Sequence, residues 1–217
     1  MPAPQELAAL PYAAYLEPLD GAPEREVDYT EVHLADTDLT DVDAGNARFT
    51  ECAVTGVSFD GGSFARARFN DVWVSRTRWI GCSWAEAQLL EVSFLDGVLA
   101  GVQAYGARMR RVVVERCKVD SLNLRGADLR DVEFRDCELL EADFGGATLA
   151  NVSFPGSTLR RARFGKAALT KVDFRGAREL DVAEGGDALR GAIIDSGQLA
   201  ELAPMLAQTL GIVVKDR

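Results

Sequence analysis

A five-residue repeat runs through most of the sequence and constrains the fold more than any other feature. Every fifth position over residues 29–174, thirty in all, is large and apolar, except for Ala44 and Ala104. The residue two places before each of these, over residues 27–172, is small, with Leu122 as the larger exception. None of these sixty positions carries a charge, although 27% of the chain is charged. Self-similarity at a fixed short period indicates a repeat architecture.

The length of the period determines the kind of repeat. Five residues fit neither an α-helix, with 3.6 residues per turn, nor a strand, with a period of two. They fit a coil that turns a corner every five residues and points both the large and the small residue inward. Four such sides close a square, and the second inward residue must be small because the large ones already fill it. The sequence therefore predicts an all-β solenoid, a right-handed quadrilateral parallel β-helix, over residues 27–194.

The segments outside the repeat are expected to cover its ends, since a solenoid otherwise exposes its core and unpaired strand edges. Residues 1–26 are rich in proline and in apolar side chains, and we expect a short helical or irregular cap against the first coil. The pentad frame slips at Glu179-Leu180 and partly recovers towards residue 194. Residues 195–217 are predicted to form a helical cap that also serves as a dimerisation tail.

A helix is predicted over residues 196–210, with Asp195 or Ser196 capping its start and Gly211 ending it. Pro204 is expected to kink or split it. Its apolar stripe has spacings of three, four and four residues and consists of Leu199, Leu202, Leu206 and Leu210. Such a stripe fits a cap packed on the last coil, and it also fits pairing with a second copy around a two-fold axis.

No catalytic, cofactor-binding or metal-binding residue is predicted. The four cysteines all fall at small inward positions, where we expect buried small hydrophobes; they are Cys52, Cys82, Cys117 and Cys137. A metal site or a thiolate nucleophile is the alternative, but no histidine accompanies them and burial raises the pKa of a thiol. His33 is the only histidine and occupies an outward position. The chain is therefore not expected to be an enzyme.

The two core tryptophans mark the one place where a ligand pocket is conceivable. Trp79 and Trp84 occupy consecutive large inward positions and are oversized for a square core. A locally widened coil, relieved by the small Ala104 one coil above, is the simpler interpretation. Residues 95–121 are the least regular part of the repeat, which indicates a bend or a looser wall.

Composition bounds the location and the partners of the chain. No apolar run approaches the roughly 18–20 residues of a membrane span. The N-terminus lacks the basic start and apolar stretch of a secretory signal, so a cytoplasmic protein with free thiols is expected. A formal charge of −10 disfavours direct nucleic-acid binding, because phosphates would be repelled.

The pentads resemble those of the pentapeptide-repeat family, whose loose consensus is A(D/N)LXX, most clearly over residues 126–154. The resemblance covers about residues 27–194 and implies the right-handed quadrilateral β-helix. The C-terminal segment, residues 189–195 followed by Gln198, Ala203 and Leu210-Gly211, is similar to the end of MfpA-type proteins. Those proteins belong with the Qnr proteins, dimeric rods that bind DNA gyrase and relieve fluoroquinolone inhibition. The mechanism proposed for them is mimicry of duplex DNA by acidic side chains.

Acidic residues are concentrated near the N-terminus, where residues 17–60 hold twelve acids and two bases, so that the rest of the chain sums to zero. Residues twenty apart stack on one side of a four-sided coil, which produces one mostly acidic column, interrupted by Arg111. With the acids of the first coil, this column makes up the candidate interaction surface: Glu31, Asp36, Asp38, Asp41, Asp43, Glu51, Asp71, Glu91 and Asp131. A solvated solenoid with an acidic end is the alternative, since other columns are mixed and Arg48, Arg68 and Arg108 form a basic one.

Two functions from different classes fit these features. The first is a non-catalytic, homodimeric protein that modulates or protects DNA gyrase by mimicking DNA, as the resemblance implies. The second is a protein-interaction scaffold for some other partner, in which the acidic bias serves solubility. An enzyme or small-molecule binder is a distant third, because it requires a pocket near Trp79 and Trp84.

Overall fold

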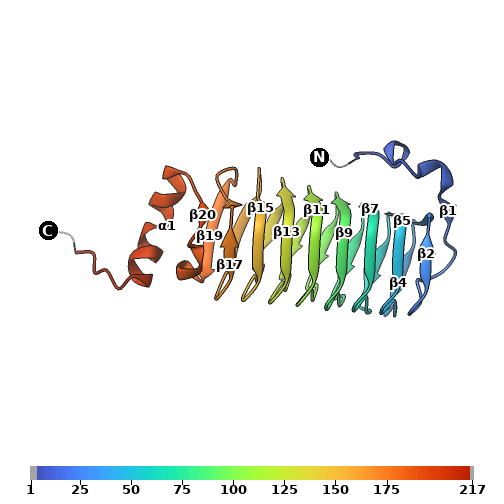
Figure 1. The fold of residues 1–217 in the computed structure, drawn as a ribbon, viewed down its shortest axis with the longest axis horizontal. Helices are drawn as coiled ribbons and strands as arrows, with labels where there is room; N and C mark the ends of the chain where they lie inside the picture. The colour runs from blue at the N-terminus through green and yellow to red at the C-terminus, as the bar shows by residue number, and fades with distance from the viewer. Residues whose placement is uncertain (1–3, 216–217) are drawn as a thin grey trace.

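Coils of twenty residues stack along a rod in the computed structural model, which describes residues 4–215 (Figure 1). Strand β5 (Arg48–Thr55) pairs in parallel with β7 (Arg68–Ser75), and Arg48 lies opposite Arg68. The same offset of twenty residues relates β7 to β9 (Gln88–Leu95). Four pentads therefore complete one turn, and the predicted parallel β-helix is confirmed.

The coils present four faces. Face 1 contains the first half of each long strand, such as residues 48–50, and face 2 the second half, such as residues 53–55. Faces 1 and 2 belong to a twelve-stranded sheet, and face 3 belongs to an eight-stranded sheet. On face 4, successive coils are joined by isolated bridges such as Asp43–Ser63. The remaining strands of the larger sheet are β1 (Glu17–Pro18), β2 (Asp28–Thr30), β3 (Val32–Ala35), β11 (Arg108–Glu115), β13 (Asp128–Arg135), β15 (Thr148–Ser153), β17 (Ala168–Thr170), β18 (Val172–Asp173) and β20 (Ala192–Ile193). The smaller sheet consists of β4 (Asp38–Thr40), β6 (Ser58–Asp60), β8 (Arg78–Ile80), β10 (Val98–Ala100), β12 (Lys118–Asp120), β14 (Glu138–Leu140), β16 (Thr158–Arg163) and β19 (Glu179–Glu184).

The large inward residues stack into columns that form the core. Phe134, Phe154 and Phe174 lie ring on ring, with centroids 5.3 and 5.1 Å apart and planes within 6° of each other. Phe144 and Phe164 make a second stack at 5.0 Å. All five rings are buried. Aromatic pairs in this offset arrangement add to the stability gained from burial itself.

Each coil turns its corners at the second residue after a large inward residue, where the backbone is left-handed. The φ angle is 53° at Glu31, 52° at Glu51 and 56° at Arg66. A non-glycine residue in this conformation costs roughly 1–2 kcal/mol. The hydrogen-bond ladder continues through the corner, since the Glu31 amide donates to the Thr50 carbonyl of the next coil at 3.0 Å. Corner side chains are consequently fixed in direction by the backbone of two coils.

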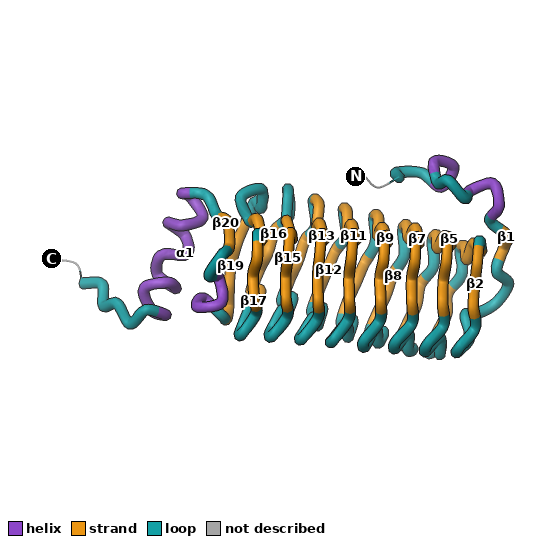
Figure 2. The backbone as a smooth tube through the Cα atoms, viewed as in Figure 1, coloured by secondary structure: helices purple, strands orange, loops and turns teal. Residues whose placement is uncertain are grey.

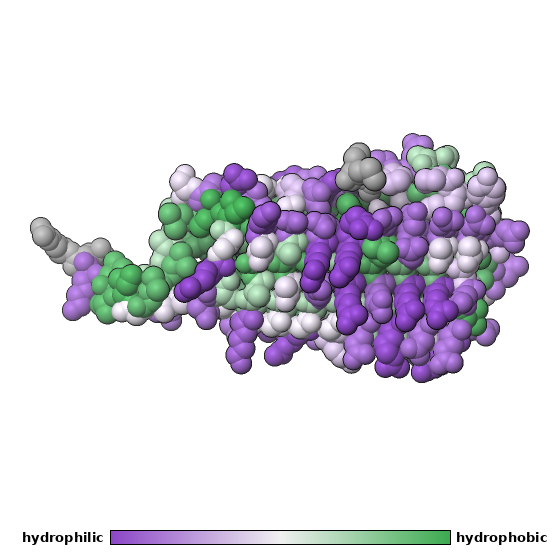
Figure 3. Space-filling view, in the orientation of Figure 1, coloured by the Kyte–Doolittle hydropathy of each residue, from purple (hydrophilic) through white to green (hydrophobic). Residues whose placement is uncertain are grey.

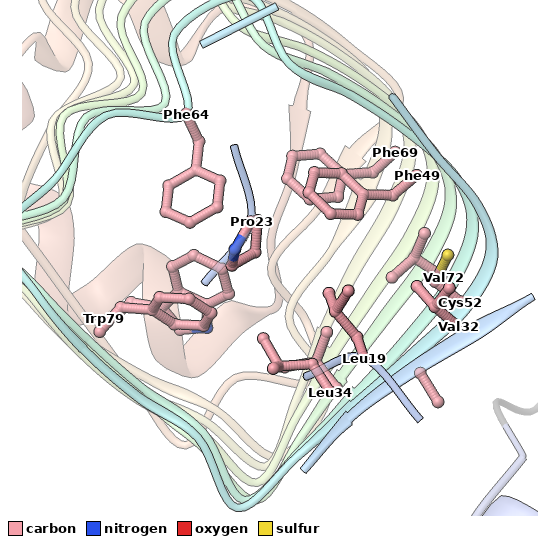
Figure 4. A pocket seen from close by; sticks show the side chains of 13 residues that line it. Leu19, Pro23, Val32, Leu34, Phe49, Cys52, Phe64, Phe69, Val72 and Trp79 are labelled. Atoms are coloured by element: carbon pink, nitrogen blue, oxygen red, sulfur yellow. The ribbon is translucent and has the colours of Figure 1, made fainter. Parts of the chain in front are cut away.

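The N-terminal end of the core is plugged by residues that precede the repeat. Leu19 and Pro23 lie across the lumen of the first coil, among the labelled inward rings (Figure 4). Beneath them remains an apolar cavity of about 20 Å³, lined in part by Trp79. Such a volume holds a single water at most. It leaves no room for the ligand considered for the tryptophan region.

The two core tryptophans differ in whether the indole N–H finds a hydrogen-bond partner. Trp79 donates from Nε1 to Thr77 Oγ1 at 3.0 Å. Trp84 is buried and stacks on Phe94 at 5.4 Å, but its Nε1 has no hydrogen-bond partner among residues 4–215. The glycine-rich stretch 95–121 pairs with both neighbouring coils in unbroken twenty-residue register. The irregular sequence there does not interrupt the strand ladders.

A strap formed by residues 4–16 runs along face 2, from the middle of the rod at Pro4 to the first coil (Figures 1 and 2). It contains the short helical turns η1 (Leu7–Ala9) and η2 (Ala13–Tyr15). Trp73 Nε1 donates to the Pro4 carbonyl at 2.8 Å, and Arg116 Nη2 donates to the Gln5 side chain at 2.9 Å. The segment expected at the first coil therefore extends alongside five coils.

The C-terminal coil departs from the repeat by one residue. Leu159 pairs with Leu180, an offset of twenty-one that accounts for the slip of the pentad frame. The chain continues through η3 (Gly186–Leu189) to helix α1 (Ser196–Thr209), which stands beside the end of the rod (Figure 1). Pro204 lies within α1 without splitting it, and Gly211, with φ of 70°, follows its end.

Candidate interaction surface

The acidic column lies at the corner between faces 1 and 2. Because pairing holds at an offset of twenty, Glu31, Glu51, Asp71 and Glu91 occupy the same corner of four successive coils. Their φ angles are 53°, 52°, 52° and 57°. We call these four residues the acidic corner column. The shared backbone conformation directs their carboxylates to one edge of the rod.

The carboxylates of this column are compensated only at its far end. Arg111, in the next coil, donates from Nε to Glu91 Oε1 at 2.8 Å. Glu31, Glu51 and Asp71 have no ion pair within residues 4–215. Burial raises the pKa of Asp71, and the neighbouring carboxylates of Glu91 and Glu51 raise it further. The neighbouring carboxylates thus add to the effect of burial on the pKa of Asp71.

Of the other predicted acids, one lies in line with this column and four do not. Asp131 lies at the same corner beyond Arg111 and accepts a hydrogen bond from Asn151. Four acids of the first coil instead form part of a ring, on face 3, on face 4 and at the two corners that flank face 3: Asp36, Asp38, Asp41 and Asp43. The Gly45 amide and the Arg25 guanidinium lower the pKa of Asp43. The predicted surface is thus an edge and an end ring rather than one patch.

The strap borders the acidic corner column, a contact that the repeat pattern did not reveal. Tyr12 is buried against face 2, and its hydroxyl donates to the Cys52 carbonyl at 3.4 Å. Burial raises the pKa of Tyr12, with a further contribution from the Asp71 and Glu51 carboxylates. The signal that was available is Trp73, a large aromatic residue at an outward position of the repeat. An aromatic side chain there indicates that something covers the face.

The four leucines of the predicted dimer interface divide into two pairs. Leu202 is buried against the last coil and Leu206 is partly buried there, whereas Leu199 is 51% and Leu210 73% exposed. Gln198 fixes this orientation, because its side chain donates to the Phe174 carbonyl at 2.6 Å. Leu199 and Leu210 are thus the most accessible of the four to a second molecule.

Gln198 also completes the start of α1. Its amide donates to Asp195 Oδ1 at 2.9 Å, and its side-chain oxygen accepts from the Asp195 amide at 3.1 Å. This reciprocal pair is a capping box. Asp195, one of the two predicted caps, therefore takes that role.

Comparisons with known proteins agree with this geometry. Residues 87–164 match the family model described as pentapeptide repeat region. The segment forms an unbroken part of the four-sided coil described above. Residues 87–164 of this solenoid are therefore a pentapeptide-repeat region.

Solved structures of pentapeptide-repeat proteins are similar to the chain at low sequence identity. A trypsin-treated variant of QnrB1, a plasmid-mediated fluoroquinolone resistance protein, matches over 92% of this chain and 96% of its own, at 16% identity and a TM-score of 0.47. HetL from Nostoc sp. strain PCC 7120, a pentapeptide-repeat protein involved in heterocyst differentiation regulation, matches over 79% and 91%, at 18% identity and a TM-score of 0.33. A comparison with curated proteins finds no match.

The cysteines and the histidine take structural places in the five-residue repeat. All four cysteines are buried and unpaired, as predicted, and burial raises the pKa of Cys82 to about 12. His33 Nε2 lies 2.8 Å from Thr55 Oγ1, and burial lowers the pKa of the imidazole. Residues 4–215 hold no cluster of three His, Cys, Asp or Glu side chains suited to a metal ion. Within the same residues, α1 is too short and too polar to span a membrane.

Proposed function

We propose that this chain is a non-catalytic interaction protein that binds DNA gyrase as a DNA mimic, and thereby modulates the enzyme or protects it from fluoroquinolones. The acidic corner column carries the proposal. It offers a carboxylate about every 4.8 Å along a straight edge, the spacing of neighbouring strands. Each strand of a DNA duplex offers a phosphate every ~3.4 Å along its axis. A protein surface built to bind phosphates with Lys and Arg therefore finds a comparable line of charge.

The rod is proposed to double its length by pairing at the C-terminal end. Exposed apolar side chains gather on α1 and the tail, as the green region at the left of Figure 3 shows; they include Leu199, Leu210, Ile212, Val213 and Val214. An apolar groove between α1 and the last coil continues this surface and is bordered by Ile194 and Leu206. Burial of such a surface against a second copy gives a closed two-fold dimer.

Leu199→Asp combined with Leu210→Asp is expected to convert the dimer into a monomer, because each change places a charge on the apolar contact. Size-exclusion chromatography with light scattering measures the mass of the particle in solution and so distinguishes monomer from dimer. Gln208→Asp adds a charge to an exposed position of the same helix and should leave the dimer intact. If the wild-type protein is monomeric at tens of micromolar, the proposal that two chains pair into a rod of double length is wrong.

The proposal is tested by adding the purified protein to a gyrase supercoiling assay, with and without a fluoroquinolone. We expect inhibition at low micromolar protein and fewer drug-stabilised breaks. Glu51→Gln, Asp71→Asn and Glu91→Gln together should remove these effects. A matched control variant carries Asp60→Asn, Asp120→Asn and Glu138→Gln, which remove three exposed acids from face 3. This variant should still inhibit supercoiling and reduce the drug-stabilised breaks.

Two outcomes of this assay contradict the proposal. Equal loss of effect in both triple variants would assign it to net charge rather than to the column. No effect of the wild type at tens of micromolar would exclude gyrase, and a pull-down would then be used to find the partner of a scaffold protein.

A further inference from the structure

A row of arginines lies on face 1 of this acidic chain, at the outward position that precedes each inward large residue. Arg48 on β5 lies opposite Arg68 on β7, Arg68 opposite Gln88 on β9, and Gln88 opposite Arg108 on β11. Neighbouring strands are ~4.8 Å apart, so Arg48 and Arg68 place like charges side by side. Like charges directly opposite each other destabilise a sheet. The fold itself gains nothing from this arrangement.

The charges of the row are only partly compensated. Arg48 Nη1 lies 3.0 Å from Asp28 Oδ2 in the coil below. Arg68 and Arg108 make no ion pair and no side-chain hydrogen bond within residues 4–215. Several other arginines pair with a carboxylate one coil away, as Arg161 does with Glu141 at 2.8 Å. The exposed Arg76 and Arg78 also lack an ion pair among residues 4–215, but they do not line the hollow beside the row. Two exposed guanidinium groups of the row are therefore free to bind an anion.

The row borders a hollow of about 390 Å³ in the surface. Its lining includes the three arginines, Gln88 and the corner residues Arg66 and Glu86. Four guanidinium groups thus face one carboxylate. Hydrophilic side chains, in purple, gather over the part of the rod that contains β5, β7 and β9 (Figure 3). The lining of the hollow therefore carries a net positive charge.

The neighbouring edge limits how wide the occupant can be. The acidic corner column lies three residues after the row, as Glu51 follows Arg48 and Asp71 follows Arg68, until Arg111 takes this corner in the coil of Arg108. A nucleic-acid duplex laid on face 1 would span both and bring its phosphates against these carboxylates. A single extended peptide is narrow enough to follow the arginines alone.

We propose that the arginine groove, formed by Arg48, Arg66, Arg68 and Arg108, binds an extended acidic segment of a partner protein that runs along the rod axis. Three coil steps, ~14 Å, separate Arg48 from Arg108. Side chains on one side of an extended peptide repeat every ~6.6 Å, so carboxylates at its first, third and fifth residues span ~13 Å. Guanidinium groups bind carboxylates through paired hydrogen bonds. The site is separate from the acidic corner column and does not require gyrase.

Fluorescence anisotropy with two labelled pentapeptides, Glu-Ser-Glu-Ser-Glu and Gln-Ser-Gln-Ser-Gln, tests the proposal in 50 mM salt. A labelled single-stranded DNA of eight nucleotides forms a third arm. The test variant combines Arg68→Gln with Arg108→Gln. The control combines Arg76→Gln with Arg78→Gln, which removes the same charge from exposed residues outside face 1. Circular dichroism checks that both variants keep the strand content of the wild type.

We expect the glutamate peptide to bind with a Kd of ~10–100 µM and to weaken several-fold in 300 mM salt. The test variant should weaken binding at least tenfold, or ~1.4 kcal/mol, and the control should not change it. Absence of binding to the wild type, or equal weakening in both variants, would overturn the proposal. Tighter binding of the DNA, lost in the test variant, would overturn it in favour of a nucleic-acid site.

Discussion

Phe154→Ala is expected to lower the free energy of unfolding by ~3–5 kcal/mol, the cost of emptying a core position of an aromatic ring. Phe154 is fully buried in the middle of a three-ring stack, 5.3 Å from Phe134 and 5.1 Å from Phe174. Its removal takes a ring contact from the coil on either side. In a solenoid each coil is stabilised mainly by its two neighbours. No contact from a more distant coil can therefore replace the ring contacts that the two neighbouring coils lose.

Urea unfolding followed by circular dichroism measures this change. Phe69→Ala is the matched control, because Phe69 occupies the same kind of inward position but is only partly buried and stacks on Phe49 alone within its column. Phe69→Ala should lower the free energy of unfolding by clearly less than Phe154→Ala does. If the two variants lose the same stability, the neighbour-by-neighbour account of the rod is wrong.

The architecture could be predicted from the sequence because one period determines every coil. The position of each large residue follows from counting in fives, and the corner that Glu31 and Glu51 share follows from counting in twenties. Such inferences hold because a stacked coil gives its residues the same surroundings as those twenty positions away. Even the break in the period at Glu179-Leu180 appears as a shift in strand register.

The ends could not be predicted in this way, because their positions depend on contacts far apart in the chain. The strap has no period, and the bond that anchors it joins Pro4 to Trp73, sixty-nine residues away. On α1 the stripe of leucines is regular, but contacts with the last coil, among them the bond from Gln198 to the Phe174 carbonyl, determine which leucines face the rod. Periodicity places residues on a helix face and does not say what that face meets.

The row of arginines on face 1 shows a third limit of prediction from the period. Counting in twenties places Arg48, Arg68 and Arg108 in one column. It does not show that Asp28 pairs with the first of them and leaves the other two without a partner. Side-chain pairing is determined by rotamers and by neighbouring columns, which vary from coil to coil while the backbone repeats.

Tyr12→Ala is expected to release the strap from face 2. Tyr12 and Leu10 pack on Ala53, Trp73 and Leu95, and Tyr12 is 3% exposed. Burial of an aromatic side chain of this size contributes ~2–4 kcal/mol. The short helical turns of the strap contribute little stability of their own, so this contact is a large part of what holds the segment in place.

Two measurements detect the release. Limited proteolysis should cut the strap faster, and a quencher in solution should reach Trp73, whose Nε1 loses its bond to the Pro4 carbonyl. Tyr15→Ala is the control, since Tyr15 lies three residues further along the same strap and is 65% exposed. Equal protease resistance in the two variants would show that the strap is held by its polar anchors, Pro4 and Gln5, rather than by the apolar contact. Release would also remove the Tyr12 ring from the neighbourhood of Glu51 and Asp71, whose carboxylates contribute to the raised pKa of Tyr12.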